Sequence, residues 1–123
     1  MKTLKTISPP VAKEVGFAKS KPVVTTVEPV KVTGCKAIPC LVIDSTGTTP
    51  DISFGFCWST KHNPTINDPK TKAHKNLPLD KKRFCETLNE LEPNTTYYVR
   101  SYAINIWGMA YGNEVSFTTG KCK

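Results

Sequence analysis

Apolar and polar residues alternate along short stretches of this chain, which is the period of a β-strand rather than of a helix. In residues 53–59, Phe54, Phe56 and Trp58 alternate with smaller residues, so these three aromatic side chains are predicted to share one buried face. Residues 97–104 alternate in the same way, with one row predicted to face the core and the other to face outward. No stretch keeps a helical period.

Turn residues separate several further apolar runs, and each run is short enough for one strand. These strands are expected at residues 23–27, 30–33, 37–44, 83–88 and 110–119. Pro29 interrupts the first two pieces, as is typical of an edge strand, while Phe84 and Leu88 are predicted to point inward. Residues 60–82 are polar and too long for a tight turn, so they are expected to hold at most one short strand. About seven short strands favour an all-β, antiparallel sandwich.

The chain of 123 residues suits one domain. Residues 1–22 are basic and contain two adjacent prolines, which indicates a flexible leader or linker; residues 23–120 are expected to form the sandwich and residues 121–123 a tail. No apolar run approaches the length of a membrane span, so direct membrane insertion is not expected. The leader lacks the apolar centre of a secretory signal, so the signal of an exported protein would not lie in this chain.

The net charge of +7 is concentrated in two places. Residues 1–22 hold five lysines against one acidic residue, and residues 61–83 hold seven basic residues against two acidic ones. A nucleic-acid-binding protein more often places its basic residues along one groove-facing element. A tail and a long loop instead indicate solvated surface, so no nucleic-acid partner is predicted.

A local motif, Leu-Glu-Pro-Asn-Thr-Thr-Tyr, precedes the longest alternating stretch. Leu91 is predicted to fill the core, Pro93 to fix the backbone at the corner, and Tyr97 to return its hydroxyl to a backbone group near the turn. This is the pattern of the tyrosine corner, which leads the chain from one sheet of an immunoglobulin-like sandwich to the other.

With this corner the chain resembles a fibronectin type III domain of the kind found in cell-surface and secreted proteins of the Bacteroidetes. The matching segments are Gly-Phe-Cys-Trp-Ser-Thr (55–60), Asn-Pro-Thr (63–65), the corner through Asn105, and residues 108–119. The resemblance implies an exported, non-enzymatic module without a cofactor, located at the cell surface, in the periplasm or outside the cell. It also implies adhesion, ligand binding or ligand presentation beside other domains of the same polypeptide. A passive spacer is the alternative.

The chain departs from the resemblance between the last two strands, where such domains have small residues and this chain has Ile106, Trp107 and Met109. In an immunoglobulin-like sandwich this turn lies at the same end as residues 45–51 and 75–82. The basic residues expected around it are Lys75, Lys81, Lys82 and Arg83. Two alternatives remain open: the tip contacts an unknown protein or glycan ligand, or Trp107 folds back as a lid over the core.

Tyr98, Arg100 and Tyr102 are predicted to form an outward-facing row on one strand. Flat rings in such a row suit a sugar or an extended peptide. In the alternative, Arg100 lies between the two tyrosines in a cation–π stack that only covers the sheet.

The five cysteines contain no C-x-x-C pair. Cys57 and Cys85, with His62 and His74, suggest a weak alternative of a Cys/His metal-binding or thiol protein. However, the two cysteines are predicted to point outward from different sheets, so no metal site is expected. Disulfides are favoured, and the candidate pairs are Cys35–Cys122 and Cys40–Cys85. Such pairs would fit an oxidising compartment.

Asp44-Ser45-Thr46 resembles the acceptor sequence that Bacteroidetes use for O-glycosylation. Ser45 is therefore a candidate modification site.

Overall fold

A computed structural model describes residues 20–48, 51–75 and 83–122 as an all-β structure of eight strands. The strands are β1 (Val23–Thr33), β2 (Lys36–Ser45), β3 (Ser53–Ser59), β4 (His74–Lys75), β5 (Arg83–Cys85), β6 (Thr96–Asn105), β7 (Gly108–Tyr111) and β8 (Val115–Thr118). All strand pairs are antiparallel.

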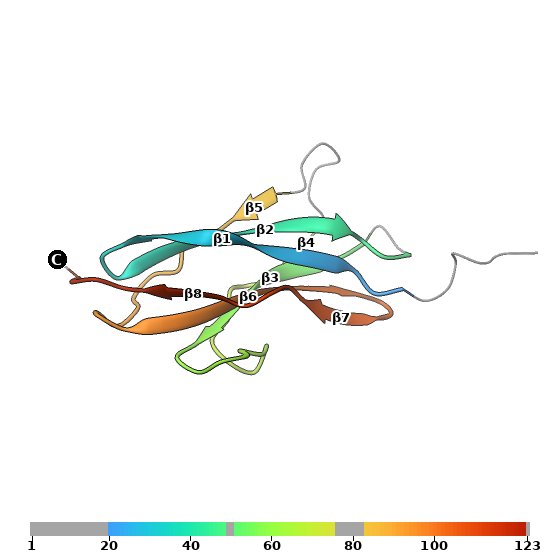
Figure 1. Cartoon of the computed structure of the whole chain (residues 1–123). Helices are drawn as coiled ribbons and strands as arrows, with labels where there is room; N and C mark the ends of the chain where they lie inside the picture. The colour runs from blue at the N-terminus through green and yellow to red at the C-terminus, as the bar shows by residue number, and fades with distance from the viewer. Residues whose placement is uncertain (1–19, 49–50, 76–82, 123) are drawn as a thin grey trace, which may run out of the picture.

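The strands form two layers (Figure 1). One sheet has the order β1-β2-β5, and the other has the order β4-β3-β6-β7, with β8 also paired to β6. β7 pairs with the second half of β6 and β8 with the first half. Together they form one interrupted strand along the same edge of β6. The predicted antiparallel β-sandwich of about seven strands is confirmed.

The core lies between the sheets and is built from the alternate positions of the long strands. Leu41 from β2, Phe56 from β3 and Val99 from β6 are completely buried. Trp58 and Phe84 are partly buried and pack against this cluster. The period-two pattern of the sequence thus selects the residues that leave water, which is the main force that holds the sheets together.

The corner before β6 joins the sheets through one side chain. The Tyr97 hydroxyl accepts a hydrogen bond from the Glu92 backbone N–H at 2.8 Å, which is the arrangement of a tyrosine corner. Leu91 is only 6% exposed, and Pro93 precedes a turn in which Asn94 has a φ of 49°. Asparagine tolerates this left-handed conformation better than most residues.

β1 and β5 differ from the expectation. The two pieces predicted on either side of Pro29 form one strand, β1, whose register with β2 shifts between Val27 and Lys31. β5 is three residues long rather than six, since Leu88 leaves it to form a separate bridge with Ala37. The short strand allowed for in the polar segment is β4.

A buried polar network closes one edge of the sandwich. The side-chain amide of Asn113 donates to the Thr26 carbonyl and accepts from the Thr26 N–H, at 3.0 and 2.9 Å. The Thr26 and Ser101 hydroxyls are 2.8 Å apart, and both residues are at most 1% exposed. A Cβ at Gly112 would lie 2.2 Å from the Ser101 Oγ, so this crossing requires glycine.

Two disulfides join distant parts of the chain. Cys35 is bonded to Cys122 and Cys40 to Cys85, the pairs that the strand positions favoured. The second disulfide directly links partners in the register of β2 and β5. Cys57 keeps its thiol and is buried.

Candidate functional site

The turn between β6 and β7 places two large apolar side chains at the surface. Ile106 is 72% exposed and Trp107 is 39% exposed. The turn is held from below by Asn105, whose Oδ1 accepts from the Trp107 N–H and whose Nδ2 donates to the Ser20 and Thr46 carbonyls. The hydrogen bonds of Asn105 therefore fix the backbone of the turn that carries the two exposed side chains.

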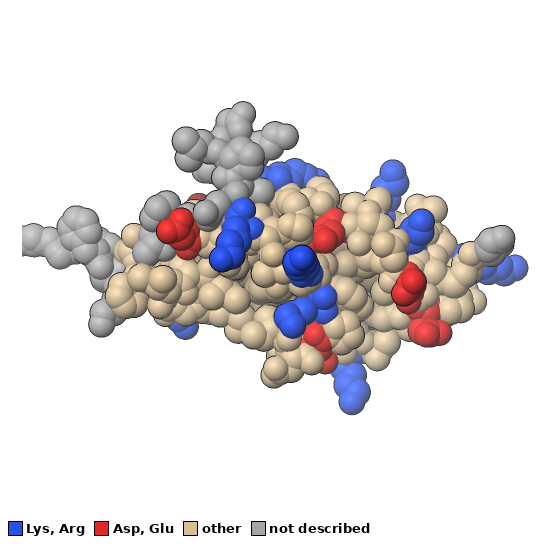
Figure 2. Space-filling view, turned by 180° about the vertical axis from the view of Figure 1, so that it is seen from behind, with Lys and Arg blue, Asp and Glu red and all other residues tan. Residues whose placement is uncertain are grey.

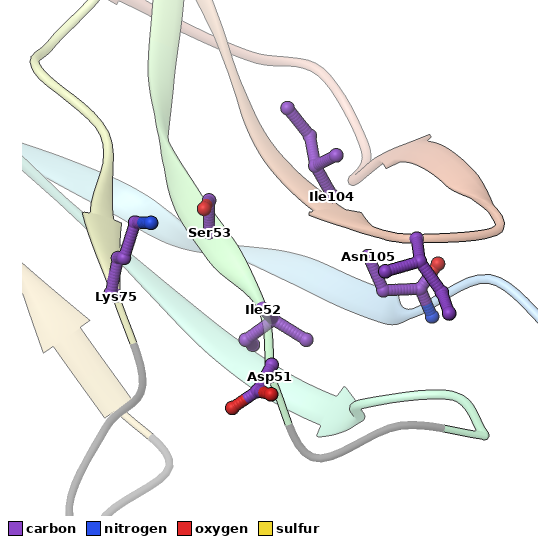
Figure 3. Close-up of a pocket in the computed structure, with 7 residues that line it drawn as sticks. Asp51, Ile52, Ser53, Lys75, Ile104 and Asn105 are labelled. Carbon is purple, nitrogen blue, oxygen red and sulfur yellow. The ribbon is translucent and has the colours of Figure 1, made fainter.

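A depression of about 440 Å³ lies beside this turn (Figure 3). Its lining residues are Asp51, Ile52, Ser53, Lys75, Ile104, Asn105 and Ile106. Ser53 is the register partner of both Lys75 and Ile104, so three adjacent strands bring these side chains together on the outer face. Aliphatic side chains thus meet one basic and one acidic side chain. We call the depression together with Ile106 and Trp107 the tip site.

The predicted tip residues are distributed unevenly around this site. Lys75 lines the depression, and Met109 is the register partner of Ile104 on β7. Arg83 is exposed at the start of β5, in the other sheet, where its register partner is Val42. Lys81 and Lys82 lie outside the described residues. Ser45, the candidate glycosylation site, is exposed at the end of β2, and its Oγ accepts from the Gly47 N–H.

Sequence reasoning missed several residues of the depression. Ile104 carried a usable signal, since it is the next outward position after Tyr102 in the alternation of β6. Asp51 lies in the turn that was expected at this end, whereas Ser53 carried no signal, because its place beside Lys75 depends on the register of β3 with β4.

The outward row of β6 is largely covered, so of the two alternatives the structure favours a covered sheet over an open aromatic platform. Tyr102 is only 1% exposed, and its hydroxyl lies 3.5 Å from the Thr71 carbonyl. Residues 60–73, called the covering segment below, pass over this face and bond the edge of β3 through Thr71 and Phe56. A ligand therefore does not reach Tyr102 in this structure.

Arg100 contacts the covering segment and a different tyrosine from the predicted ones. Its Nε donates to the Pro64 carbonyl at 2.9 Å, and its guanidinium lies 4.0 Å from the centre of the Tyr111 ring. The alternative in which a cation–π contact of Arg100 covers the sheet thus holds with Tyr111 as the partner in place of Tyr98 and Tyr102. Tyr98 instead lies 4.0 Å, ring centre to ring centre, from His62.

Glu114 fastens the covering segment at its other side. Its carboxylate accepts from the Asn63 N–H and contacts the His62 Nδ1 at 2.8 Å. Burial would raise the pKa of Glu114, but the hydrogen bonds from Asn63 and His62, together with the charges of His62 and Arg100, outweigh it and lower the pKa below 4.5. The ionised form is thus the one that holds the segment.

The residues of the Cys/His alternative are occupied elsewhere. Cys85 is in a disulfide, His74 is paired with Glu86 at 3.0 Å, and burial raises the pKa of the Cys57 thiol to about 11. Such a thiol is unreactive at neutral pH. In the described part of the chain, no group of three or more His, Cys, Asp or Glu side chains is placed to hold a metal ion.

Charged side chains of both signs share the face drawn in Figure 2, where Lys and Arg lie among Asp and Glu. Within residues 20–48, 51–75 and 83–122, no helix is long and apolar enough to cross a membrane.

No protein-family model and no curated protein matches the sequence. Among solved structures, the chain is similar to the sensor domain of the anti-sigma factor RsgI4 in Pseudobacteroides cellulosolvens, with 14% identity and a TM-score of 0.63 over 83% of this chain and 97% of that one. A solution structure of that sensor domain gives 14% identity and a TM-score of 0.62, over 83% of this chain and 77% of that one.

The chain is also similar to the FN1–FN3 domains of chicken CNTN1, with 17% identity and a TM-score of 0.56. The match covers 81% of this chain and 33% of the CNTN1 chain. At these identities the likeness concerns the fold. The chain folds as an immunoglobulin-like antiparallel β-sandwich of the fibronectin type III kind.

Proposed function

We propose that this chain is a non-catalytic module of an exported bacterial protein and that it binds a protein or glycan ligand through the tip site. The observation that carries this proposal is the exposure of Ile106 and Trp107 directly beside a depression lined by aliphatic and charged side chains. Large apolar side chains grouped at a surface are costly to leave in water and commonly mark contact sites.

The composition of the tip site suits recognition. Tryptophan is among the residues that most often dominate binding energy when a partner buries them. Lys75 and Asp51 lie at the same depression and offer one donor and one acceptor group to orient a ligand. An apolar group with polar neighbours therefore fits this surface.

Two further observations support the export and the class of protein. The disulfides Cys35–Cys122 and Cys40–Cys85 suit an oxidising compartment. The solved structures that share the fold include one described as a sensor domain and one as part of a chain with several fibronectin domains. We infer that other domains of the same polypeptide adjoin this one and that its source is among the Bacteroidetes, as the sequence resemblance suggests.

The alternative is a passive spacer without a ligand of its own. In that case Trp107, which is less exposed than Ile106, serves as a lid over the end of the core. The exposure of Ile106 favours the binding proposal, because a lid needs no second apolar side chain pointing into water.

The proposal is tested with an array of glycans and matrix proteins probed with the folded, oxidised protein. Wild type should bind at least one class, and Trp107→Ala, Ile106→Ser and Lys75→Ala should each weaken that binding by about tenfold or more. Ile106→Ser should disturb the fold less than Trp107→Ala does, because Ile106 is 72% exposed and Trp107 is 39% exposed.

Lys36→Ala is the matched control for Lys75→Ala, since both are exposed lysines on strands but Lys36 lies beside the Cys35–Cys122 disulfide. It should bind as wild type does. Absence of any wild-type binding, or equal binding by all three tip variants, would leave the spacer as the better description.

A further inference from the structure

The described chain enters and leaves the sandwich at opposite ends. Ser20 lies at the tip-site end, where its carbonyl accepts from the side-chain amide of Asn105 at 2.8 Å. Cys122 lies at the far end, where Gly120 bonds to Gly34 and to Asn94. Figure 1 shows β1 running the length of the molecule between these two ends.

β1 is an extended strand that runs most of the way from the tip-site end to the far end. Its 11 residues cover about 36 Å at about 3.3 Å per residue. Even when fully stretched, the chain from Ser20 to Cys35 reaches only about 54 Å. Detaching β1 from its neighbours would therefore add little length, on the order of 20 Å or less.

The Cys35–Cys122 disulfide continues this path by joining the end of β1 to the end of the described chain. A pull applied to the two termini follows β1, crosses the disulfide and leaves at Cys122. Residues 36–121 form a closed loop outside that path. Among them are β3, β4 and β6, the strands that build the tip site.

We propose that β1 and the Cys35–Cys122 disulfide form a covalent strap, which transmits tension between neighbouring parts of a polypeptide without lengthening this domain. This function rests on the proposed role as a module beside other domains. β3, β4 and β6, which build the tip site, lie outside this covalent path and meet it through side-chain hydrogen bonds such as that of Asn105 to the Ser20 carbonyl.

The Cys35–Cys122 disulfide prevents most of the extension that the unfolded chain could reach. Without either disulfide, the roughly 100 residues from Ser20 to Cys122 could stretch to about 370 Å. The Cys40–Cys85 disulfide lies entirely inside the shielded loop and closes 45 residues of it. It therefore limits extension only after the Cys35–Cys122 disulfide has been opened.

Because one disulfide lies inside the loop closed by the other, removing each of them separately should change the extension of the protein differently. The full chain, in a Cys57→Ser background that prevents thiol exchange, is pulled between handles at its two ends in an optical trap. The oxidised protein should lengthen by no more than about 20 Å when β1 detaches. Cys35→Ser/Cys122→Ser should release about 150 Å, and dithiothreitol, which reduces both disulfides and is itself oxidised, should raise the release to about 300 Å.

Cys40→Ser/Cys85→Ser is the matched control. It also loses one disulfide, yet its extension should equal that of the oxidised protein, since that disulfide is not in the path of the tension. An extension above about 100 Å in the oxidised protein or in this control would overturn the strap. If Cys35→Ser/Cys122→Ser does not fold, the control can be pulled before and after reduction. It holds only the Cys35–Cys122 disulfide, so the difference in extension again measures the effect of that disulfide.

Failure of the strap and failure of the proposed function give different results. A protein that binds no ligand but stays short under tension keeps the strap and loses the tip site as a binding site. A protein that binds through Trp107 but lengthens while oxidised keeps the tip site and loses the strap.

Discussion

At the residue scale, Tyr97 combines two roles in one side chain. Its ring stacks on Phe117, with the ring centres 5.6 Å apart, and its hydroxyl holds the Glu92 N–H. The role of the hydroxyl follows from a motif of seven consecutive residues, which explains why the sequence alone predicted it, whereas Phe117 lies outside that motif.

Replacement of Tyr97 by phenylalanine should separate these roles. Tyr97→Phe keeps the ring but leaves the part-buried Glu92 N–H without its partner, so the free energy of unfolding should fall by about 1–2 kcal/mol. Urea denaturation measures this. Tyr98→Phe, on the outer face of the same strand, should change stability by less than about 0.5 kcal/mol. Equal losses in the two variants would contradict a specific role for the corner hydroxyl.

Other residues resisted prediction because their partners come from distant parts of the chain. Arg100 stacks on Tyr111 only through the register of β6 with β7, and Tyr102 is buried only because Thr71 passes over it. The alternation placed both side chains on the correct face. It contained no information about what covers that face.

At the scale of elements, the covering segment shows how a polar stretch becomes ordered structure. The sequence indicated a long loop over residues 60–82; in its described part, residues 60–75, β4 is the regular strand and directly follows the covering segment. Besides its bonds to the edge of β3, this segment is held by bonds from the side chains of Arg100, Tyr111 and Glu114 to backbone groups of residues 63–66. Such bonds leave no periodic pattern, so they are invisible to reasoning from periodicity.

The attachment of this segment should depend on pH through Glu114. Because the pKa of Glu114 is lowered in the folded protein, its contribution is present above about pH 4.5 and is lost as the pH falls through the lowered value. The hydrogen-exchange protection factor of the Asn63 amide, followed by NMR, should therefore fall in that acidic range. Glu114→Gln should reduce the protection at pH 6 and remove the acidic transition.

A second His–Glu contact in the molecule provides the control. Glu86 contacts His74 at 3.0 Å, a geometry similar to that of Glu114 with His62, but it lies beside β4 and β5. Glu86→Gln should leave Asn63 protection and its pH dependence unchanged. A similar effect of both variants would show a general loss of stability rather than release of the covering segment.

At the scale of the whole molecule, the sandwich was predictable because its layers follow from period-two alternation and from one local corner. The split of the last strand was not. Asn113 lies between β7 and β8 and bonds the backbone of Thr26 on β1, and this contact joins residues 87 positions apart. The disulfide pairs were indicated by the ends and faces on which their cysteines lie, although the sequence alone left the connectivity open.

The two disulfides should contribute similarly to thermodynamic stability, although only one of them lies in the path of tension. They join residues 87 and 45 positions apart, and the entropy of a closed loop grows only with the logarithm of its length. Removal of either pair should therefore cost about 4–5 kcal/mol in the free energy of unfolding, measured by guanidinium denaturation of the two serine double variants. If the strap is correct, the two double variants should lose similar free energy of unfolding and yet differ in how far they extend under force. If Cys35→Ser/Cys122→Ser lost stability yet extended no further than Cys40→Ser/Cys85→Ser, the Cys35–Cys122 disulfide would stabilise the fold without limiting its extension.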